Sequence, residues 1–135
     1  MAQQPVLVAM QAARSEDHAR RIGQHLFQRF SETYPVLFRD AGTVFDFLSR
    51  IDGVIHVEVR KLYPDAELPT LPCERIAPNQ LVLLYSSPRG FADLAAGLID
   101  GCIAHYKEPI KVERTDLEKE GNLHRTRFHL VSEAA

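Results

Sequence analysis

The stretch "LYSSPRGF", residues 84–91, follows an apolar run and is interrupted by a proline and a glycine. Side chains alternate between the two faces of a strand, so Tyr85, Ser87 and Arg89 are expected on one side. The stretch therefore predicts the end of a strand that carries a cluster of hydrogen-bond donors.

The segments around this stretch predict a small antiparallel sheet with one helix. Residues 79–87, "NQLVLLYSS", predict the strand itself, and helical spacing from Phe91 to Cys102 predicts a helix after it. Residues 109–117 and 124–131 alternate as two further strands. The intervening "EKEGN" supplies the Gly and Asn that a hairpin turn requires.

The first half of the chain predicts two helices and a stiff linker. One helix is expected from about Ser15 to Tyr34, where Pro35 ends it, and a second from a Thr43 cap to Leu62. Residues 64–78 contain four prolines and predict an extended connection. We therefore expect a single α+β domain over residues 1–135, with N-terminal helices packed on a small antiparallel sheet and one further helix.

Composition excludes several functional classes. The chain has 135 residues, 45% apolar residues and a formal charge of −2, which gives no basic excess for a nucleic-acid partner. Only two cysteines occur, without Cys-x-x-Cys spacing, so neither a disulfide framework nor a thiolate zinc site is expected. The longest apolar run, "LVLLY", is too short to span a membrane, and the predicted location is the cytoplasm.

His56 is the histidine with the most informative position. It lies between the apolar Ile55 and Val57, and Gly53 leaves open space beside it. Burial of an unpaired imidazole is unfavourable, so His56 is expected either to be hydrogen-bonded in the core or to bind a ligand such as a haem iron.

The donor cluster of Tyr85, Ser87 and Arg89 has two interpretations. A guanidinium and two hydroxyls can hold the propionates of a haem, because buried carboxylates need charge-assisted donors. Alternatively, the hydroxyls solvate a turn and Arg89 is exposed. His56 favours the first interpretation.

Taken together, these residues resemble the haem-nitric oxide/oxygen-binding (H-NOX) domains, sensor modules of bacteria and of soluble guanylate cyclase. "IDGVIHVEVRKLYP" resembles the segment that bears the family's proximal histidine, here His56, and "YSSPR" matches its Tyr-x-Ser-x-Arg motif. Pro69 falls where the family's proline packs against the porphyrin. The resemblance implies haem b with His56 as axial ligand to the iron. The other residues that it places around the haem are Tyr85, Ser87, Arg89, Pro69, Phe30, Leu26, Leu94 and Leu98.

The chain is shorter than most members of this family. Residues 1–40 resemble a remnant of the helices that cover the distal haem face, and residues 41–135 resemble the proximal subdomain. A missing distal cover implies an exposed haem, a second subunit over it, or the loss of haem. Because monomers rarely expose a large apolar patch, self-association as a homodimer is expected.

The resemblance also implies a ligand and a partner. Leu94 stands where oxygen-binding members have a distal tyrosine, and Leu26 adds no donor, so nitric oxide rather than oxygen is expected. Relatives' zinc ligands are replaced by Phe91, Asp93 and Leu117, so no zinc is expected. The implied partner is a histidine kinase or a cyclic-di-nucleotide enzyme.

Two other functions remain as alternatives. The chain could be a truncated, haem-free relative that acts as a dimeric interaction or regulatory module. An enzyme is less favoured, since Asp46, Asp52 and Glu58 are spaced as solvated helix acids and no phosphate-binding loop occurs.

Overall fold

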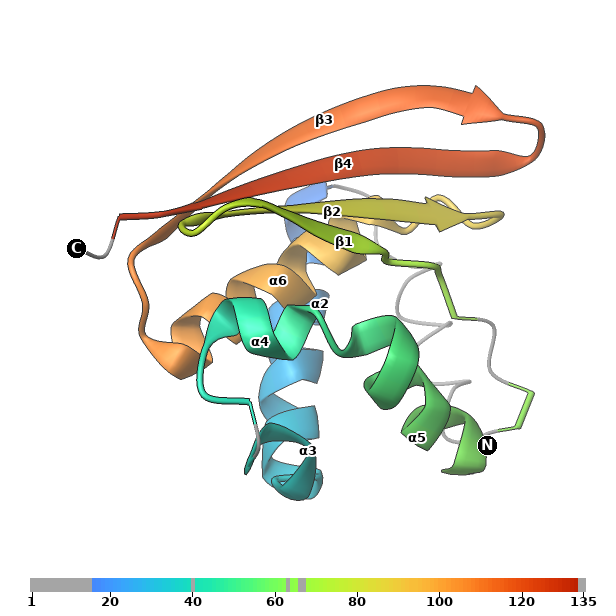
Figure 1. Ribbon diagram of the computed structural model, residues 1–135. Helices are drawn as coiled ribbons and strands as arrows, with labels where there is room; N and C mark the ends of the chain where they lie inside the picture. The colour runs from blue at the N-terminus through green and yellow to red at the C-terminus, as the bar shows by residue number, and fades with distance from the viewer. Residues whose placement is uncertain (1–15, 40, 63, 66–67, 134–135) are drawn as a thin grey trace.

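The computed structural model describes residues 16–39, 41–62, 64–65 and 68–133. Its helices all lie on one face of a four-stranded antiparallel sheet with the order β1-β2-β4-β3 (Figure 1). The elements are α2 (Glu16–Thr33), α3 (Val36–Arg39), α4 (Val44–Leu48), η1 (Ile51–Ile55), α5 (His56–Leu62), β1 (Cys73–Ala77), β2 (Gln80–Ser87), α6 (Ala92–Tyr106), β3 (Ile110–Glu120) and β4 (Leu123–Ser132). The predicted α+β class is confirmed.

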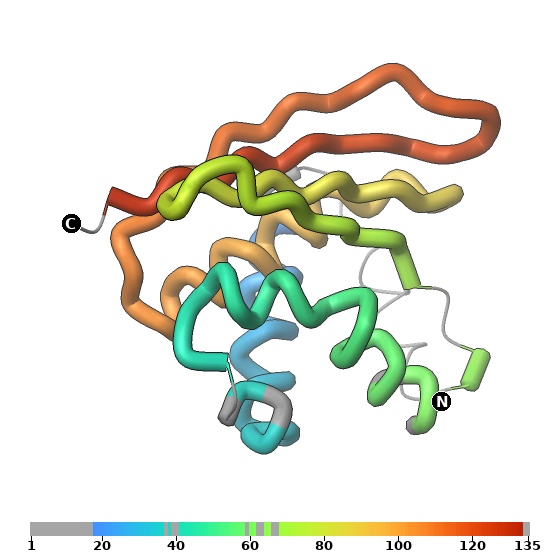
Figure 2. Tube along the Cα trace, in the orientation of Figure 1, coloured from blue at the N-terminus to red at the C-terminus, as the bar shows by residue number. Residues whose placement is uncertain are grey.

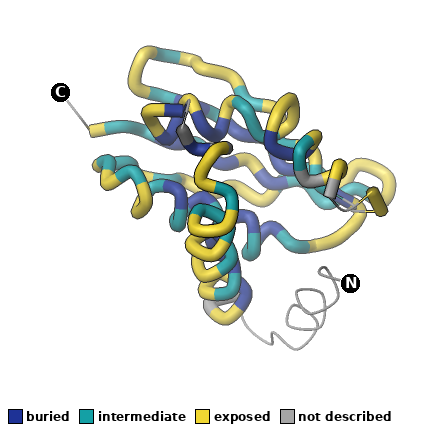
Figure 3. The backbone as a smooth tube through the Cα atoms, turned by 90° about the horizontal axis from the view of Figure 1, so that it is seen from below, coloured by how far each residue is buried: buried dark blue, intermediate teal, exposed yellow. Residues whose placement is uncertain are grey.

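The sheet forms because β2 and β4 bury one face each. Leu81, Leu83 and Tyr85 alternate with half-buried residues along β2, and Leu83 pairs with Phe128 of β4. The predicted hairpin joins β3 and β4, and Gly121 supplies its positive φ of 61°. In Figure 3 the buried residues gather on the strands and on the inner sides of the helices.

Helix α2 packs along α6 at backbone distance. A Cβ atom at Gly97 would overlap the carbonyl oxygen of Arg20, and one at Gly23 would overlap that of Leu94. Phe27 lies 2.7 Å from the position that a Cβ of Gly101 would take. The helix from about Ser15 is confirmed over its described part, while Ser15 itself lies outside the described residues.

The second predicted helix is wrong as a continuous element. Thr43 does cap it, accepting from the Asp46 amide at 3.1 Å, but α4 ends at Leu48. The hydroxyl of Ser49 then bonds to the carbonyl of Phe45, and a π-helical turn, η1, follows before α5. Figure 2 shows the bend in this stretch. Apolar spacing alone cannot register a change of helical period.

The predicted linker also contains a strand that the sequence analysis missed. Strand β1 pairs antiparallel with β2, and its burial pattern is that of an edge strand. Pro72 and Pro78 flank it on either side. Prolines are compatible with an edge strand because one side of its backbone has no neighbour to bond.

Candidate functional site

His56 opens helix α5, directly after the π-helical turn. It is 9% exposed, and its Nδ1 lies 3.3 Å from Oδ1 of Asp52. Burial lowers the pKa of His56, while Asp52 opposes that shift. The lowered pKa favours a neutral imidazole. If Nδ1 carries the proton toward Asp52, Nε2 keeps the lone pair that a metal requires.

Asp52 connects His56 to the segment before β1. Both of its carboxylate oxygens lie 3.0 Å from the amide nitrogen of Leu71. The neighbouring Thr70 forms an antiparallel bridge with Ser86, with amide-to-carbonyl distances of 3.0 and 3.1 Å. A continuous series of polar contacts therefore runs from His56 to the strand that carries Tyr85 and Ser87.

Tyr85 and Ser87 lie on the inner face of β2, as predicted, but Arg89 does not share that face. The strand ends at Ser87, and Arg89 is exposed in the following turn. The Tyr85 hydroxyl donates to the carbonyl of Arg89 at 2.8 Å and accepts from the Phe91 amide at 3.1 Å. Oγ of Ser87 accepts from the amide of Arg89 at 3.1 Å. The two hydroxyls therefore shape the turn that presents Arg89.

The remaining predicted contact residues lie on two helices and in the segment before β1. Leu26 and Phe30 are half-buried on α2, Leu94 and Leu98 are half-buried on α6, and Pro69 is half-buried beside the Thr70 bridge. Phe30 and Leu98 pack against the hydrophobic core. Their roles toward a haem stay predictions.

The donor set fits a haem by its chemistry. A buried neutral imidazole with its Nδ1 beside a carboxylate is the form in which histidine ligates a metal. Gly53 has no heavy atom within 4 Å of its Cβ position, so space is open beside the turn that precedes His56. The exposed guanidinium of Arg89 is a donor of the kind that binds propionates, whereas the Ser87 hydroxyl forms a hydrogen bond with Tyr85.

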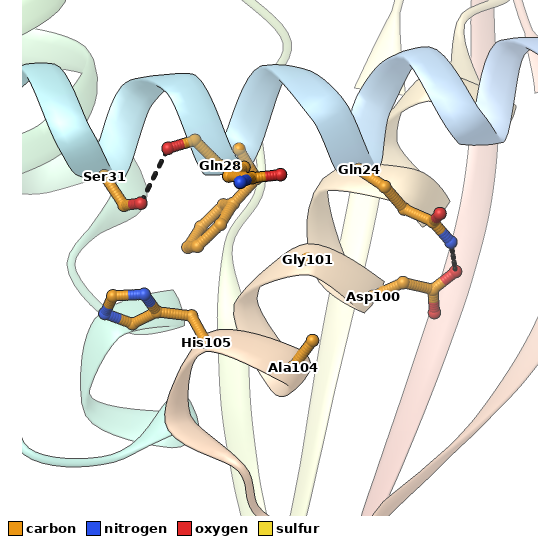
Figure 4. Close-up of a pocket in the computed structure, with 8 residues that line it drawn as sticks. Gln24, Gln28, Ser31, Asp100, Gly101, Ala104 and His105 are labelled. Atoms are coloured by element: carbon orange, nitrogen blue, oxygen red, sulfur yellow. Dashed lines mark hydrogen bonds between the residues drawn. The ribbon is translucent and has the colours of Figure 1, made fainter.

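A pocket of about 430 Å³ lies elsewhere, between α2 and α6 (Figure 4). Gln24, Gln28 and Ser31 line it from α2, and Asp100 and His105 line it from α6. None of the residues predicted to contact a haem belongs to its lining.

The contacts of Asp52 differ from the prediction, which grouped this residue with the solvated helix acids. The spacing of Asp52 to His56 is four residues, a spacing at which helical side chains meet, and this signal was available. The contact with Leu71 was not, because it joins residues 19 positions apart. Asp93, predicted only as a replaced zinc ligand, forms an ion pair with Arg114.

Comparisons with known proteins identify the family and the fold. A "Haem-NO-binding" family model matches residues 7–114. A mutant of the T. Tengcongensis H-NOX is similar at TM-score 0.80 and 24% identity, covering 94% of this chain and 69% of its own. An oxygen-binding H-NOX domain related to soluble guanylate cyclases has TM-score 0.78 and 25% identity, covering 88% of this chain and 62% of its own.

A third similar structure is a mutant of the Cs H-NOX with an unnatural amino acid, at TM-score 0.80 and 25% identity; the match covers 88% of this chain and 63% of that one. The chain thus spans about two thirds of these solved domains.

Comparison with curated proteins gives no match. None of the helices in the described part has the length and apolarity needed to cross a membrane. The family match covers most of the chain, and the chain belongs to the haem-NO-binding family, whose members are haem-based gas sensors.

Proposed function

We propose that this chain is a non-catalytic gas-sensing domain that binds haem b through His56. The observation that carries this proposal is the buried imidazole of His56, whose Nδ1 lies 3.3 Å from Asp52 and which is connected through Asp52, Leu71 and Thr70 to the Tyr85 strand. The family match and the similar solved H-NOX structures support it.

Each residue has a distinct task in this proposal. Haem supplies an iron atom that can bind a diatomic gas. His56 ligates the iron through Nε2, and Arg89 holds a propionate with its guanidinium fork. Tyr85 and Ser87 keep the turn of Arg89 in place. Pro69 and the apolar Phe30, Leu26, Leu94 and Leu98 contact the porphyrin.

Nitric oxide is the proposed gas. Leu26 and Leu94 present hydrocarbon side chains, which cannot donate a hydrogen bond to bound dioxygen. Nitric oxide binds ferrous haem without such a donor. A Leu94→Tyr variant should therefore gain oxygen affinity.

The proposed signal is a movement of His56 and of helix α5 against the sheet. His56 would hold the haem, and a change in its bond to the iron would act on the polar series that runs through Asp52 and Thr70. A histidine kinase or a cyclic-di-nucleotide enzyme in the bacterial cytoplasm then reads the altered surface. A second copy of the chain is a further proposed partner.

One observation favours a second candidate, a haem-free dimeric interaction module. The Tyr85 hydroxyl already donates to one backbone group and accepts from another in its own turn. In this candidate the motif serves only the fold of the turn, and the protein regulates a partner without a cofactor.

Absorption spectra distinguish the two candidates. We expect a Soret band after hemin addition, and a further shift after dithionite and nitric oxide. His56→Gly should lose this band and recover it with added imidazole, whereas His25→Gln, an exposed histidine on α2, should match the parent protein. A protein without a Soret band, or a His56→Gly variant with full haem affinity, contradicts the sensor proposal.

A further inference from the structure

The carboxylate of Asp52 contacts two parts of the molecule that are far apart in the sequence. Oδ1 lies 3.3 Å from Nδ1 of His56, and both oxygens lie 3.0 Å from the amide nitrogen of Leu71. Its side chain is 40% exposed, so these contacts are made at the surface end of the imidazole.

The π-helical turn explains how Asp52 reaches both groups. The amides of Val54 and Ile55 both donate to the carbonyl of Arg50, at 2.8 and 3.0 Å, and the His56 amide donates to the carbonyl of Ile51. This widened turn holds one residue more than an α-helical turn, and such turns are frequent at functional sites. Asp52 lies within it, between the imidazole and the linker.

We propose that Asp52 is a positioning residue that holds the His56 imidazole by Nδ1 and ties helix α5 to Leu71. The inference rests on the proposed function of His56 as the haem ligand. A carboxylate on Nδ1 sets the tautomer, orients the ring and increases the basicity of Nε2.

The same carboxylate transmits the position of His56 to the sheet. Leu71 follows Thr70, whose backbone pairs with Ser86 between Tyr85 and Ser87. A displacement of the imidazole therefore changes the position of β2, the strand that carries Tyr85 and Ser87. Leu71 provides the link through its backbone amide, which every substitution except proline retains.

The first experiment uses the haem-free protein, so that it is independent of haem binding. Nitrogen NMR shifts of His56, assigned by their loss in His56→Gln, report which ring nitrogen carries the proton. We expect Nδ1–H in the parent protein and a shift toward Nε2–H in Asp52→Ala and Asp52→Leu, because neither replacement side chain can accept a hydrogen bond from Nδ1–H. The matched control is Glu58→Gln. Glu58 lies on α5, the helix of His56, and pairs with Lys61 at 3.0 Å, so this variant should keep the parent tautomer.

Asp52→Leu also removes both acceptor oxygens but keeps a side chain of similar size, so it provides a second test if Asp52→Ala fails to fold. An unchanged His56 tautomer in the folded variant overturns the role of Asp52, regardless of whether the protein binds haem.

The second experiment uses the hemin-loaded protein. In Asp52→Ala the hemin dissociation constant should rise about 10- to 100-fold, and the ferrous iron-histidine vibration should move to lower frequency. Glu58→Gln should change neither. Equal affinity and an equal vibration in Asp52→Ala overturn the positioning role while haem binding stands. A parent protein that binds no hemin overturns the proposed function, and the NMR result then decides the contact between Asp52 and His56 by itself.

Discussion

The α2–α6 pair and the segment around His56 are held by different kinds of contact. Between α2 and α6 the backbones touch, and a Cβ at Gly23 or Gly97 would overlap a carbonyl of the facing helix. Around His56, a Cβ at Gly53 would meet no atom within 4 Å, and Val54 and Val57 are 44% and 43% exposed. Ile55 packs into the hydrophobic core here, and polar contacts of Asp52 hold the exposed side of the segment.

The difference indicates that the α2–α6 pair is a rigid support and that the segment around His56 can move. Close packing responds to a misfit by strain over many contacts, whereas a few exposed polar contacts contribute only about 1 kcal/mol each. The packed pair therefore sets the stability of the domain, and the His56 segment can change position at small cost.

The largest expected effect tests the packed pair directly. Gly97→Ala should lower the free energy of unfolding by about 2–4 kcal/mol, because its Cβ overlaps the Arg20 carbonyl and a helix must shift. Urea denaturation measures the loss. Gly53→Ala is the matched control, and it should be neutral or stabilising by about 0.5–1 kcal/mol. Equal destabilisation by both variants would remove the distinction between the two regions.

A smaller effect is expected at the turn of the predicted propionate motif. Tyr85→Phe leaves the Phe91 amide and the Arg89 carbonyl without their partner, at a cost of about 1–3 kcal/mol. The control is Tyr106→Phe, since the buried Tyr106 hydroxyl has no hydrogen-bond partner among the described residues. That variant should be neutral or more stable. Thermal unfolding of both proteins compares them, and a harmless Tyr85→Phe would exclude the hydroxyl as the support of the turn.

The cap of α4 should have a moderate effect. Thr43→Ala removes the acceptor of the Asp46 amide and should cost about 1 kcal/mol in urea denaturation. Thr33→Ala, at the exposed end of α2, should change stability by only a few tenths of a kcal/mol. If Thr33→Ala costs as much as Thr43→Ala, the loss does not arise from capping.

The smallest expected effect concerns an exposed ion pair on the sheet. Arg114 lowers the pKa of Asp116 from its usual value of 3.8, so the ionised carboxylate stabilises the fold above that pH. This contribution is lost as the pH falls through the folded-state pKa. Asp116→Asn should lower the melting temperature by about 1–2 °C near pH 7, and the difference should shrink as the pH falls below 3.8 toward the lowered folded-state pKa. A difference that persists in acid would point to the Thr126 contact instead of the charge.

Most regular elements could be predicted, because their signals are local. The alternation of β2, the hairpin glycine at Gly121 and the Thr43 cap each depend on a few neighbouring residues. The break after Leu48 could not be predicted in this way, because the apolar spacing continues through it. Strand β1 was missed because flanking prolines favour a linker, and only its pairing with β2 makes it a strand.

The candidate site divides in the same way. The amino-acid sequence by itself determined the family and the residue types that point to haem, His56 and the Tyr-x-Ser-x-Arg motif. Only the tertiary structure decided that Asp52 faces His56 and Leu71, that Thr70 pairs with Ser86, and that Arg89 leaves the strand. The physical reason is that a motif is a property of neighbouring positions. A hydrogen bond between residues 19 apart exists only when a helix and a sheet edge are folded side by side.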